Sequence, residues 1–322
     1  MTASTGRPIF LLIDGHAVIY RAYYGLPKLS DPKGRVVNAV FGFTRILLSA
    51  INEFQPEYLA LTFDHPTPTF RHKEFKEYKA QRPKMPDDLQ PQIPLVKEVV
   101  TALNIPQFEQ AGFEADDLIG TVSKILDHQP EKIGASANLL TIIVTGDKDM
   151  FQLVDENTHV WLPGRSRVKD REYDAAGVEE KMGVRPDQIV DLKALMGDSS
   201  DNIPGVRGIG PKTAVKLLNK FKTLDGVLAQ VDKLVSGELD KDEIIKGSLF
   251  TKLKESQAEA LLSQKLARIE TKVPLKINIE QCRVEAYDKT KVVELFKELD
   301  FRSLIKELPS DQFETEIQAA LF

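Results

Sequence analysis

The chain has 322 residues, 42% of them hydrophobic and 28% charged, with a formal net charge of −5. These values are ordinary for a water-soluble globular protein and leave room for one large domain or two smaller ones. The single cysteine, Cys282, excludes a disulfide framework and fits a reducing compartment. Because the apolar run at residues 9–13 is short, we expect neither a signal peptide nor a membrane span there.

The first half of the chain alternates between buried-strand and helical patterns. The predicted strands are residues 9–14, 58–64 and 139–147, and the predicted helices are residues 36–54, 95–104 and 114–127. Each strand is a continuous apolar run that closes on an aspartate, as expected for strands buried on both faces. This alternation predicts an α/β domain with a mainly parallel central sheet flanked by helices.

The pattern changes after about residue 175, where short helical stretches are separated by Gly and Pro. We therefore predict a second, helical unit and a final helical stretch at residues 292–308. The predicted organisation is an α/β domain at 1–184, a helical unit at 185–270, a segment at 271–308 that packs on the first domain, and a tail or linker at 309–322.

Acidic residues from five separate segments are expected at one edge of the sheet. Ligands of open parallel sheets bind outside the carboxyl ends of the strands, where three of these acids fall and where the others can join them. The nine acids are Asp14, Asp64, Glu114, Asp116, Asp117, Asp147, Asp149, Asp198 and Asp201.

Such a cluster of like charges needs cations to stay ionised. With few histidines and one distant cysteine, the sequence does not favour zinc, whereas oxygen ligands suit Mg²⁺ or Mn²⁺. Each acid also has a structural alternative, because aspartates cap helices, follow strands in turns and occupy polar loops.

Two segments are basic although the whole chain is acidic. Residues 71–84 contain six Lys/Arg and two Glu, and residues 203–224 contain five Lys/Arg and no acid. Binding follows such local patches more than net charge. Phe70, Phe75 and Tyr78 lie within or beside the first segment, which favours a channel for single-stranded nucleic acid. An amphipathic surface helix is the alternative.

The second basic segment, GVRGIGPKTAVKLL, resembles a phosphate-binding loop but has Pro211 where that loop needs lysine. The glycines instead predict a tight turn whose backbone approaches a phosphate before a helix start. Lys212, Lys216 and Lys220 recur every four residues and form one helical stripe. The segment therefore predicts a hairpin between helices that grips a sugar-phosphate backbone, or a solvated lysine face after an ordinary turn.

Five motifs in order give the chain a family resemblance. LLIDGHAVIYRAYY, FDHPTPTFRHKEFKEYKAQRP, FEADDLIG, TGDKDMFQLV and GDSSDNIPGVRGIGPKTA resemble motifs of the 5′ nuclease domain of bacterial DNA polymerase I. The resemblance covers residues 9–308. It implies a 5′ nuclease (PIN-like) fold with a helical arch at about 70–90 and a helix–hairpin–helix subdomain.

The resemblance also implies roles for individual residues. All nine acids named above match its metal-binding carboxylates, and Lys79, Arg82 and Arg21 match its basic active-site residues. The implied DNA-binding positions are Arg71, Tyr78, Lys79, Arg82, Gly205, Val206, Gly208, Gly210, Lys212, Thr213 and Lys216. Two Mg²⁺ ions are implied at the acids, and often a potassium ion at the hairpin.

The implied function is a 5′–3′ exonuclease and flap endonuclease that hydrolyses DNA by a two-metal-ion mechanism in replication and repair. The implied setting is the bacterial cytoplasm and nucleoid, as a monomer away from membranes, with a polymerase domain in the same chain or in a partner. Two alternatives remain open: a Mg²⁺-dependent phosphatase of small molecules, and a non-catalytic helix–hairpin–helix DNA-binding module. The first leaves the lysine stripe unexplained, and the second has no need for nine acids.

Overall fold

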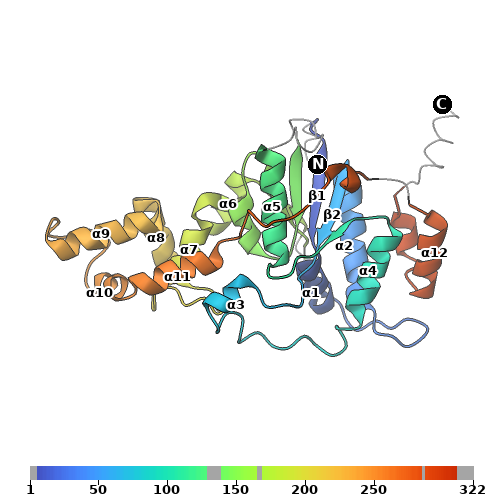
Figure 1. Ribbon diagram of the computed structural model, residues 1–322, viewed down its shortest axis with the longest axis horizontal. Coiled ribbons are helices and arrows are strands. Elements are labelled where there is room, and N and C mark those ends of the chain that lie inside the picture. The colour runs from blue at the N-terminus through green and yellow to red at the C-terminus, as the bar shows by residue number, and fades with distance from the viewer. Residues whose placement is uncertain (1–5, 129–138, 165–168, 285–286, 310–322) are drawn as a thin grey trace.

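The computed structural model describes residues 6–128, 139–164, 169–284 and 287–309. Its centre is a six-stranded sheet in the order β3-β2-β1-β4-β5-β6 (Figure 1). The strands are β1 (Ile9–Asp14), β2 (Tyr58–Thr62), β3 (Gln107–Phe108), β4 (Leu140–Val144), β5 (Thr158–Leu162) and β6 (Arg171–Tyr173). Strands β1 to β5 pair in parallel and only β6 is antiparallel, so the predicted fold class is confirmed.

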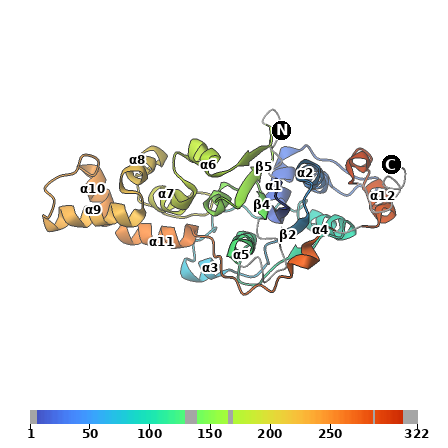
Figure 2. The ribbon, with the colours of Figure 1, turned by 90° about the horizontal axis from the view of Figure 1, so that it is seen from above.

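Helices cover both faces of the sheet, and several of them form a separate group at one end (Figures 1 and 2). The α-helices are α1 (Gly15–Gly25), α2 (Asn38–Phe54), α3 (Phe70–Glu74), α4 (Gln92–Ala102), α5 (Ala115–His128), α6 (Ala175–Met182), α7 (Ile189–Met196), α8 (Pro211–Phe221), α9 (Leu224–Ser236), α10 (Ser248–Glu255), α11 (Gln257–Ala267) and α12 (Lys289–Glu298). Short 3₁₀ turns are η2 (Lys148–Leu153), η3 (Pro186–Gln188), η4 (Ile279–Cys282) and η5 (Leu304–Glu307).

The central strand β1 shows why the sequence contains continuous apolar runs. Its neighbours are β2 and β4, so its backbone is paired on both sides. Phe10 and Leu12 belong to the core on the α5 side of the sheet, and Leu11 and Ile13 belong to the core beneath α1, α2 and α4. Both faces are therefore buried, and every position of the strand favours an apolar side chain.

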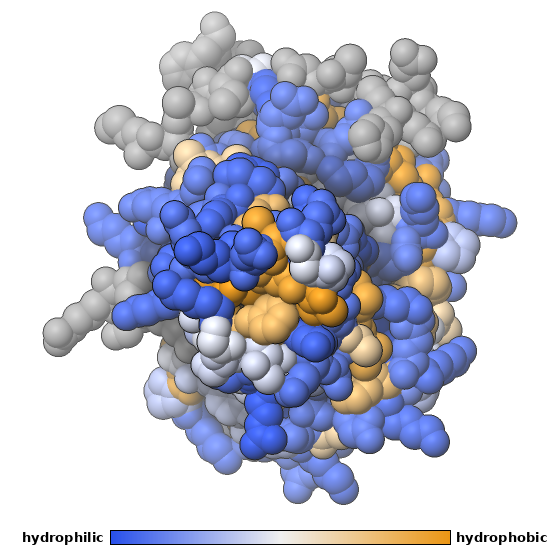
Figure 3. Space-filling model, turned by 90° about the vertical axis from the view of Figure 1, so that its left-hand side faces the viewer, coloured by the Kyte–Doolittle hydropathy of each residue, from blue (hydrophilic) through white to orange (hydrophobic). Residues whose placement is uncertain are grey.

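The helices α7 to α11 extend from one edge of the sheet (Figure 1). Their apolar side chains, such as Leu217 of α8 and Val227 of α9, belong to the same continuous core as Phe10 and Leu12. The helical unit therefore continues the core on the α5 side, and the predicted boundary at residue 184 stays a prediction. Figure 3 shows this end of the molecule as mainly hydrophilic, with an apolar patch at the centre of the face.

After α11 the chain returns to the α/β part. In Figure 1 the segment that follows α11 crosses in front of α5 before it reaches η4 and α12. In α12, Val292 and Phe296 are fully buried in the core beneath α2 and α4. The packing of residues 271–308 on the first domain stays a prediction in its bounds, and the predicted tail after Pro309 lies outside the described residues.

Most of the expected strands and helices are present, but the helical stretch expected at 292–308 is α12, which ends at Glu298, followed by the 3₁₀ turn η5. The sequence analysis missed α1, α6, β3, β5 and β6, which are short or lack a distinct pattern. The predicted helical arch is helical only in α3, and turns follow it to α4. Pro83, Pro86 and Pro91 remove backbone donors there, and Lys79 has a left-handed backbone with φ of +56°. No helix in the described parts of the chain is both long and apolar enough to cross a membrane.

Candidate active site

Three of the predicted acids lie side by side because their strands do. Asp14 is the last residue of β1, and Asp64 and Asp147 follow the neighbouring strands β2 and β4 at the same edge of the sheet. Each also accepts a backbone hydrogen bond near the start of a helix or 3₁₀ turn, from Ala17 at 3.0 Å, from Ala115 at 2.8 Å and from Asp149 at 2.9 Å, respectively. The helix-cap alternative therefore describes these side chains too, and the caps fix their orientation.

A cleft of about 350 Å³ lies at this edge. Five predicted metal ligands and three predicted basic residues line it, together with three aromatic or histidine side chains that the sequence analysis did not single out. These eleven are Asp14, Asp64, Glu114, Asp116, Asp147, Arg21, Lys79, Arg82, His16, Tyr20 and Tyr24. Residues at the ends of β1, β2 and β4, in α1, at the start of α5 and in the segment after α3 thus meet in one place.

The charges of the strand-end acids oppose one another. Burial, together with the carboxylates of Asp64 and Asp147, raises the pKa of Asp14 to about 7, although Ala17 and Thr145 donate hydrogen bonds that lower it. The pKa of Asp116 also lies well above its usual value because it is buried beside Asp117. A bound cation would relieve this repulsion and restore the ionised forms.

Glu114 and Asp201 are paired with side chains from the segment after α3. The ammonium of Lys79 donates to Glu114 at 2.7 Å and lies 3.7 Å from Asp201, which is also bound by Arg82. The hydroxyl of Tyr78 lies 3.0 Å from Glu114 and 3.2 Å from Asp201. The backbone N–H of Lys79 donates to the carbonyl of Asp201, which holds the left-handed residue in place.

Asp149 and Asp198 share a partner that the sequence analysis missed. Lys193, a mostly buried residue of α7, forms ion pairs with both carboxylates. Burial by itself would raise the pKa of Asp198, but the ion pair with Lys193 outweighs it and lowers the pKa to about 2. Burial and the nearby carboxylate of Asp147 raise the pKa of Asp149 to about 7. The available signal was the lysine in the helix IVDLKALM, whose other residues are apolar except Asp191, because a buried lysine needs an acidic partner.

Asp117 is separated from the cleft. It is fully buried and forms a two-pronged ion pair with Arg71, at 2.7 and 2.8 Å. The side chain of Arg71 is only 2% exposed, so in this conformation it is out of reach of DNA. The structure thus brings together most of the predicted acids but places this pair in the interior.

The donor set fits a hard divalent cation chemically, since the acids offer only carboxylate oxygens and one of them is destabilised by its neighbours. In the described parts of the chain, however, no three Asp, Glu, His or Cys side chains are grouped so that they could hold an ion. Lysine and arginine side chains neutralise part of the set instead, which leaves the strand-end acids as the group most in need of a cation.

The predicted hairpin lies between α7 and α8. Gly205 and Gly208 have φ of +62° and +81°, and a side chain at Gly205 would collide with the backbone of Gly197 at 2.2 Å. Val206 is buried and its N–H donates to Leu195, which ties the hairpin to α7. The glycines are therefore required by conformation and close packing.

The exposed side of the hairpin is basic. In α8, Ala214, Leu217 and Leu218 are buried, while Lys212 and Lys216 point to solvent, as the stripe predicted. One further cation comes from outside the motif, because the ammonium of Lys252 in α10 donates to the carbonyl of Gly208 at 3.2 Å.

Comparison with known proteins agrees with this arrangement. Residues 9–183 match the family described as 5′–3′ exonuclease, N-terminal resolvase-like domain, and residues 184–290 match 5′–3′ exonuclease, C-terminal SAM fold. The chain belongs to the 5′–3′ exonuclease family. The resemblance seen in the motifs is thereby confirmed, and membership of this family makes the chain a nuclease, a hydrolase of phosphodiester bonds.

Two relatives differ in how much of their own length this chain matches. It is 36% identical over 297 residues to a 5′–3′ exonuclease of Aquifex aeolicus, and the match covers 92% of this chain and 94% of that protein. It is 38% identical over 317 residues to DNA polymerase I of Bacillus subtilis, which covers 98% of this chain but 34% of the polymerase. The exonuclease-family chain thus spans about a third of the length of that polymerase.

Two solved structures share the fold of this exonuclease-family chain. One is T5 5′-exonuclease with bound zinc ions, with a TM-score of 0.64 and 21% identity over 82% of this chain and 90% of that one. The other is the catalytic core of Rad2 in complex with DNA substrate, with a TM-score of 0.59 and 16% identity over 94% and 93% of the two chains.

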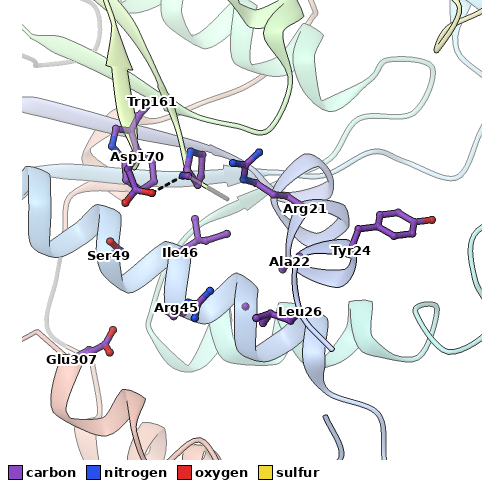
Figure 4. Close-up of a pocket in the computed structure, with 14 residues that line it drawn as sticks. Arg21, Ala22, Tyr24, Leu26, Arg45, Ile46, Ser49, Trp161, Asp170 and Glu307 are labelled. Carbon is purple, nitrogen blue, oxygen red and sulfur yellow. Dashed lines mark hydrogen bonds between the residues drawn. The ribbon is translucent and has the colours of Figure 1, made fainter. Parts of the chain in front are cut away.

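A second cavity, of about 530 Å³, shares lining residues with the acidic cleft, and Figure 4 shows this second cavity. Arg21 and Tyr24 of α1 line both spaces, and Arg45 of α2 lines the second one. Figure 4 shows Arg21 reaching from α1 toward the strands, while Arg45 and Ser49 come from α2. Of the predicted basic active-site residues, Lys79 and Arg82 line only the acidic cleft, whereas Arg21 lines both the cleft and the second cavity.

Proposed function

We propose that the chain is a structure-selective 5′ nuclease that hydrolyses DNA phosphodiesters at a 5′ flap or at a 5′ end next to duplex. One observation carries the proposal: Asp14, Asp64 and Asp147 line a single cleft with Lys79 and Arg82 at its side. Clustered acids that need a cation, next to basic groups that would receive a phosphate, suit phosphodiester hydrolysis. The hairpin beside this cleft would hold the duplex through its backbone, without reading sequence.

Two Mg²⁺ ions, or Mn²⁺ in their place, are proposed at the acids. Asp14, Asp64, Glu114, Asp116 and Asp147 would hold them from the cleft. Three other acids contact residues that line it: the N–H of Asp149 donates to Asp147, Asp198 accepts from the N–H of Ser200, and Asp201 pairs with Arg82. When bound, the ions would make water a better nucleophile and stabilise charge on the departing 3′-oxygen.

The protein's own cations would act on the phosphate. Lys79 is held at the cleft by Glu114, and Arg82 by Asp201, so both can turn from a carboxylate to a phosphate without leaving the site. Their charges would offset the charge that builds on the phosphate as water adds and the bond to the 3′-oxygen breaks. The products would be a 5′-phosphate and a 3′-hydroxyl.

The duplex would lie against the hairpin and α8. The backbone of Gly205, Val206, Gly208 and Gly210 would approach one phosphate, and Lys212, Thr213 and Lys216 would contact the strand beyond it. A potassium ion is proposed at the hairpin carbonyls. Lys252 already supplies one positive charge at the carbonyl of Gly208, so it would share that role.

A polymerase domain, in the same chain or in a partner, would supply the substrate by displacing a 5′ strand. Support comes from the B. subtilis relative, which is a DNA polymerase of which this chain matches about a third. Removal of such strands in replication and repair, in the bacterial cytoplasm at the nucleoid and by a monomer, is the proposed setting.

The test is a duplex with a 5′ flap, labelled at either end, incubated with and without Mg²⁺. The expected result is Mg²⁺-dependent release of the flap by a cut next to the junction. Hydrolysis of a small phosphomonoester without cutting of the flap would favour the phosphatase. Binding that needs no metal and produces no cut would favour the non-catalytic module.

A further inference from the structure

The segment that follows α11 is fastened to α5 at several points. We call residues 266–273 the strap; they run from the end of α11 along α5. The helix is shaped to receive them, because a side chain at Gly120 would lie 2.6 Å from the Ile269 side chain. This close approach leaves no room between the strap and α5.

The first fastening is the buried pair of Arg71 and Asp117. Besides its two bonds to Asp117, Arg71 donates to Glu114 at 3.2 Å and to the carbonyls of Leu266 at 3.0 Å and Arg268 at 2.8 Å. Asp117 in turn accepts from the backbone N–H of Glu270 at 2.8 Å. A buried ion pair is tolerated when further hydrogen bonds satisfy it, and here the strap supplies them.

The second fastening comes from Gln152 and Thr121. The amide of Gln152 donates to Ala267 at 3.1 Å and accepts from the N–H of Ile269 at 2.9 Å. The hydroxyl of Thr121 accepts from the N–H of Val273 at 3.1 Å. Neither side chain lines the catalytic cleft, so both can be changed without touching the acids.

The strap joins the two parts that the proposed reaction must align. At its start, α11 packs on α7, and Ser263 of α11 accepts from the N–H of Gly205 in the hairpin at 2.9 Å. Along its length it is fixed to α5, whose N-terminal end carries Glu114 and Asp116 in the cleft. Only a few residues separate the hairpin contact from the α5 contacts.

We propose that the strap fixes the distance between the duplex-holding hairpin and the catalytic carboxylates, and thereby selects which phosphodiester is cut. Asp117 and Arg71 are positioning residues in this arrangement and not contacts to metal or DNA. The inference rests on the proposed function, because it concerns where the same site cuts a flap.

The experiment compares cut positions on the labelled 5′-flap duplex with Mg²⁺. Thr121→Ala/Gln152→Ala should move at least half of the product to positions one or two nucleotides from the parental cut, with a total rate within about threefold of the parent. The matched control is Thr101→Ala/Gln107→Ala, which removes a Thr–Gln hydrogen bond of 2.9 Å between α4 and β3, away from the strap. The control should cut at the parental position.

Thermal unfolding checks that each variant is folded. If the double variant does not fold, the single variant Gln152→Ala, which removes two hydrogen bonds to the strap, takes its place. Parental cut positions in the strap variant, or an equal spread in the control, would overturn the inference while leaving the proposed function intact. A parent that cuts no flap would overturn the proposed function and the inference with it.

Asp117 gives a second readout through rescue. Asp117→Asn removes the main charge partner of the buried Arg71 and leaves it only Glu114, at 3.2 Å. Arg71→Gln/Asp117→Asn removes both charges of the pair and keeps hydrogen-bonding groups. A positioning role predicts that the double variant cleaves at least tenfold faster than Asp117→Asn. No recovery, with weakened Mg²⁺ binding in both variants, would make Asp117 a metal ligand and overturn its positioning role.

Discussion

The acids at the strand ends and the acids brought by helices and loops are held in different ways. Asp14, Asp64 and Asp147 receive hydrogen bonds from backbone N–H groups, and Asp14 also from Thr145. Asp117 and Asp198, by contrast, are paired with arginine or lysine. A backbone amide orients a carboxylate without cancelling its charge, whereas an ion pair does both.

This difference separates two tasks that look identical in the sequence. The strand-end acids are oriented by backbone N–H groups but keep their charges, so they repel one another. This repulsion contributes to the raised pKa of Asp14, and a cation is needed to keep these acids ionised. Acids with a built-in partner instead connect segments, as Asp117 connects α5 to the strap. We therefore expect the acids at the strand ends to be the stronger metal ligands of the nine.

The largest expected effect is on the strand-end group. Asp14→Asn should lower the rate of flap cleavage about 10³-fold, because a ligand charge is lost where no built-in cation replaces it. Asparagine caps helices as well as aspartate does, so α1 should remain folded. Single-turnover cleavage with saturating enzyme measures the effect.

Asp174→Asn is the matched control, since Asp174 caps α6 by accepting from Gly177 at 2.7 Å but lies outside the cleft. Its cleavage rate should equal that of the parent. A loss of less than tenfold in Asp14→Asn would contradict the distinction between the two groups of acids.

A smaller loss is expected when one built-in cation is removed. Lys79→Ala should slow the chemical step about 10²-fold, because a charge that can turn toward the phosphate is lost. Pre-steady-state cleavage separates this step from binding, and Lys76→Ala, an exposed lysine of the same segment, serves as control. A change in DNA affinity alone would argue against a role for Lys79 in the reaction.

Proton competition sharpens the comparison further. The pKa of Asp14 is about 7 in the absence of metal, so below that pH the carboxyl holds a proton that a bound ion must displace. The Mg²⁺ concentration for half-maximal activity should therefore rise about tenfold for each pH unit below 7. Titrations between pH 7.5 and 5.5 measure this, and a flat dependence would show that Asp14 does not take part in binding the ion.

The smallest effect is expected at the hairpin. Lys252→Ala should weaken DNA binding about threefold and lower the salt dependence of binding by roughly one ion, because one backbone contact is lost. The loss should be smaller in K⁺ than in Na⁺, since potassium can occupy the vacated place. Fluorescence anisotropy measures both, and Lys254→Ala on the same helix is the control. If Lys252→Ala and Lys254→Ala bind DNA with equal affinity, Lys252 does not contact DNA.

Much of the fold follows from local patterns. The apolar runs of β1, β2 and β4 were recognisable because strands buried on both faces need apolar residues at every position. The two-residue strand β3 and the antiparallel β6 carry no such pattern, because they pair at the edges of the sheet. The arch was expected to be helical, but α3 ends at Glu74 because Phe75 has an extended backbone, and the left-handed Lys79 and the prolines further along do not favour a new helix before α4.

The sequence by itself determined that Asp14, Asp64 and Asp147 would meet, because parallel strands joined by helices place all their carboxyl ends at one edge. It also determined the hairpin, whose glycines are required by the backbone alone. Only the tertiary structure decided that Asp117 would face Arg71 and that Lys193 would join Asp149 to Asp198. The partner of a buried charge comes from a distant segment, and local patterns carry no information about which segment that is.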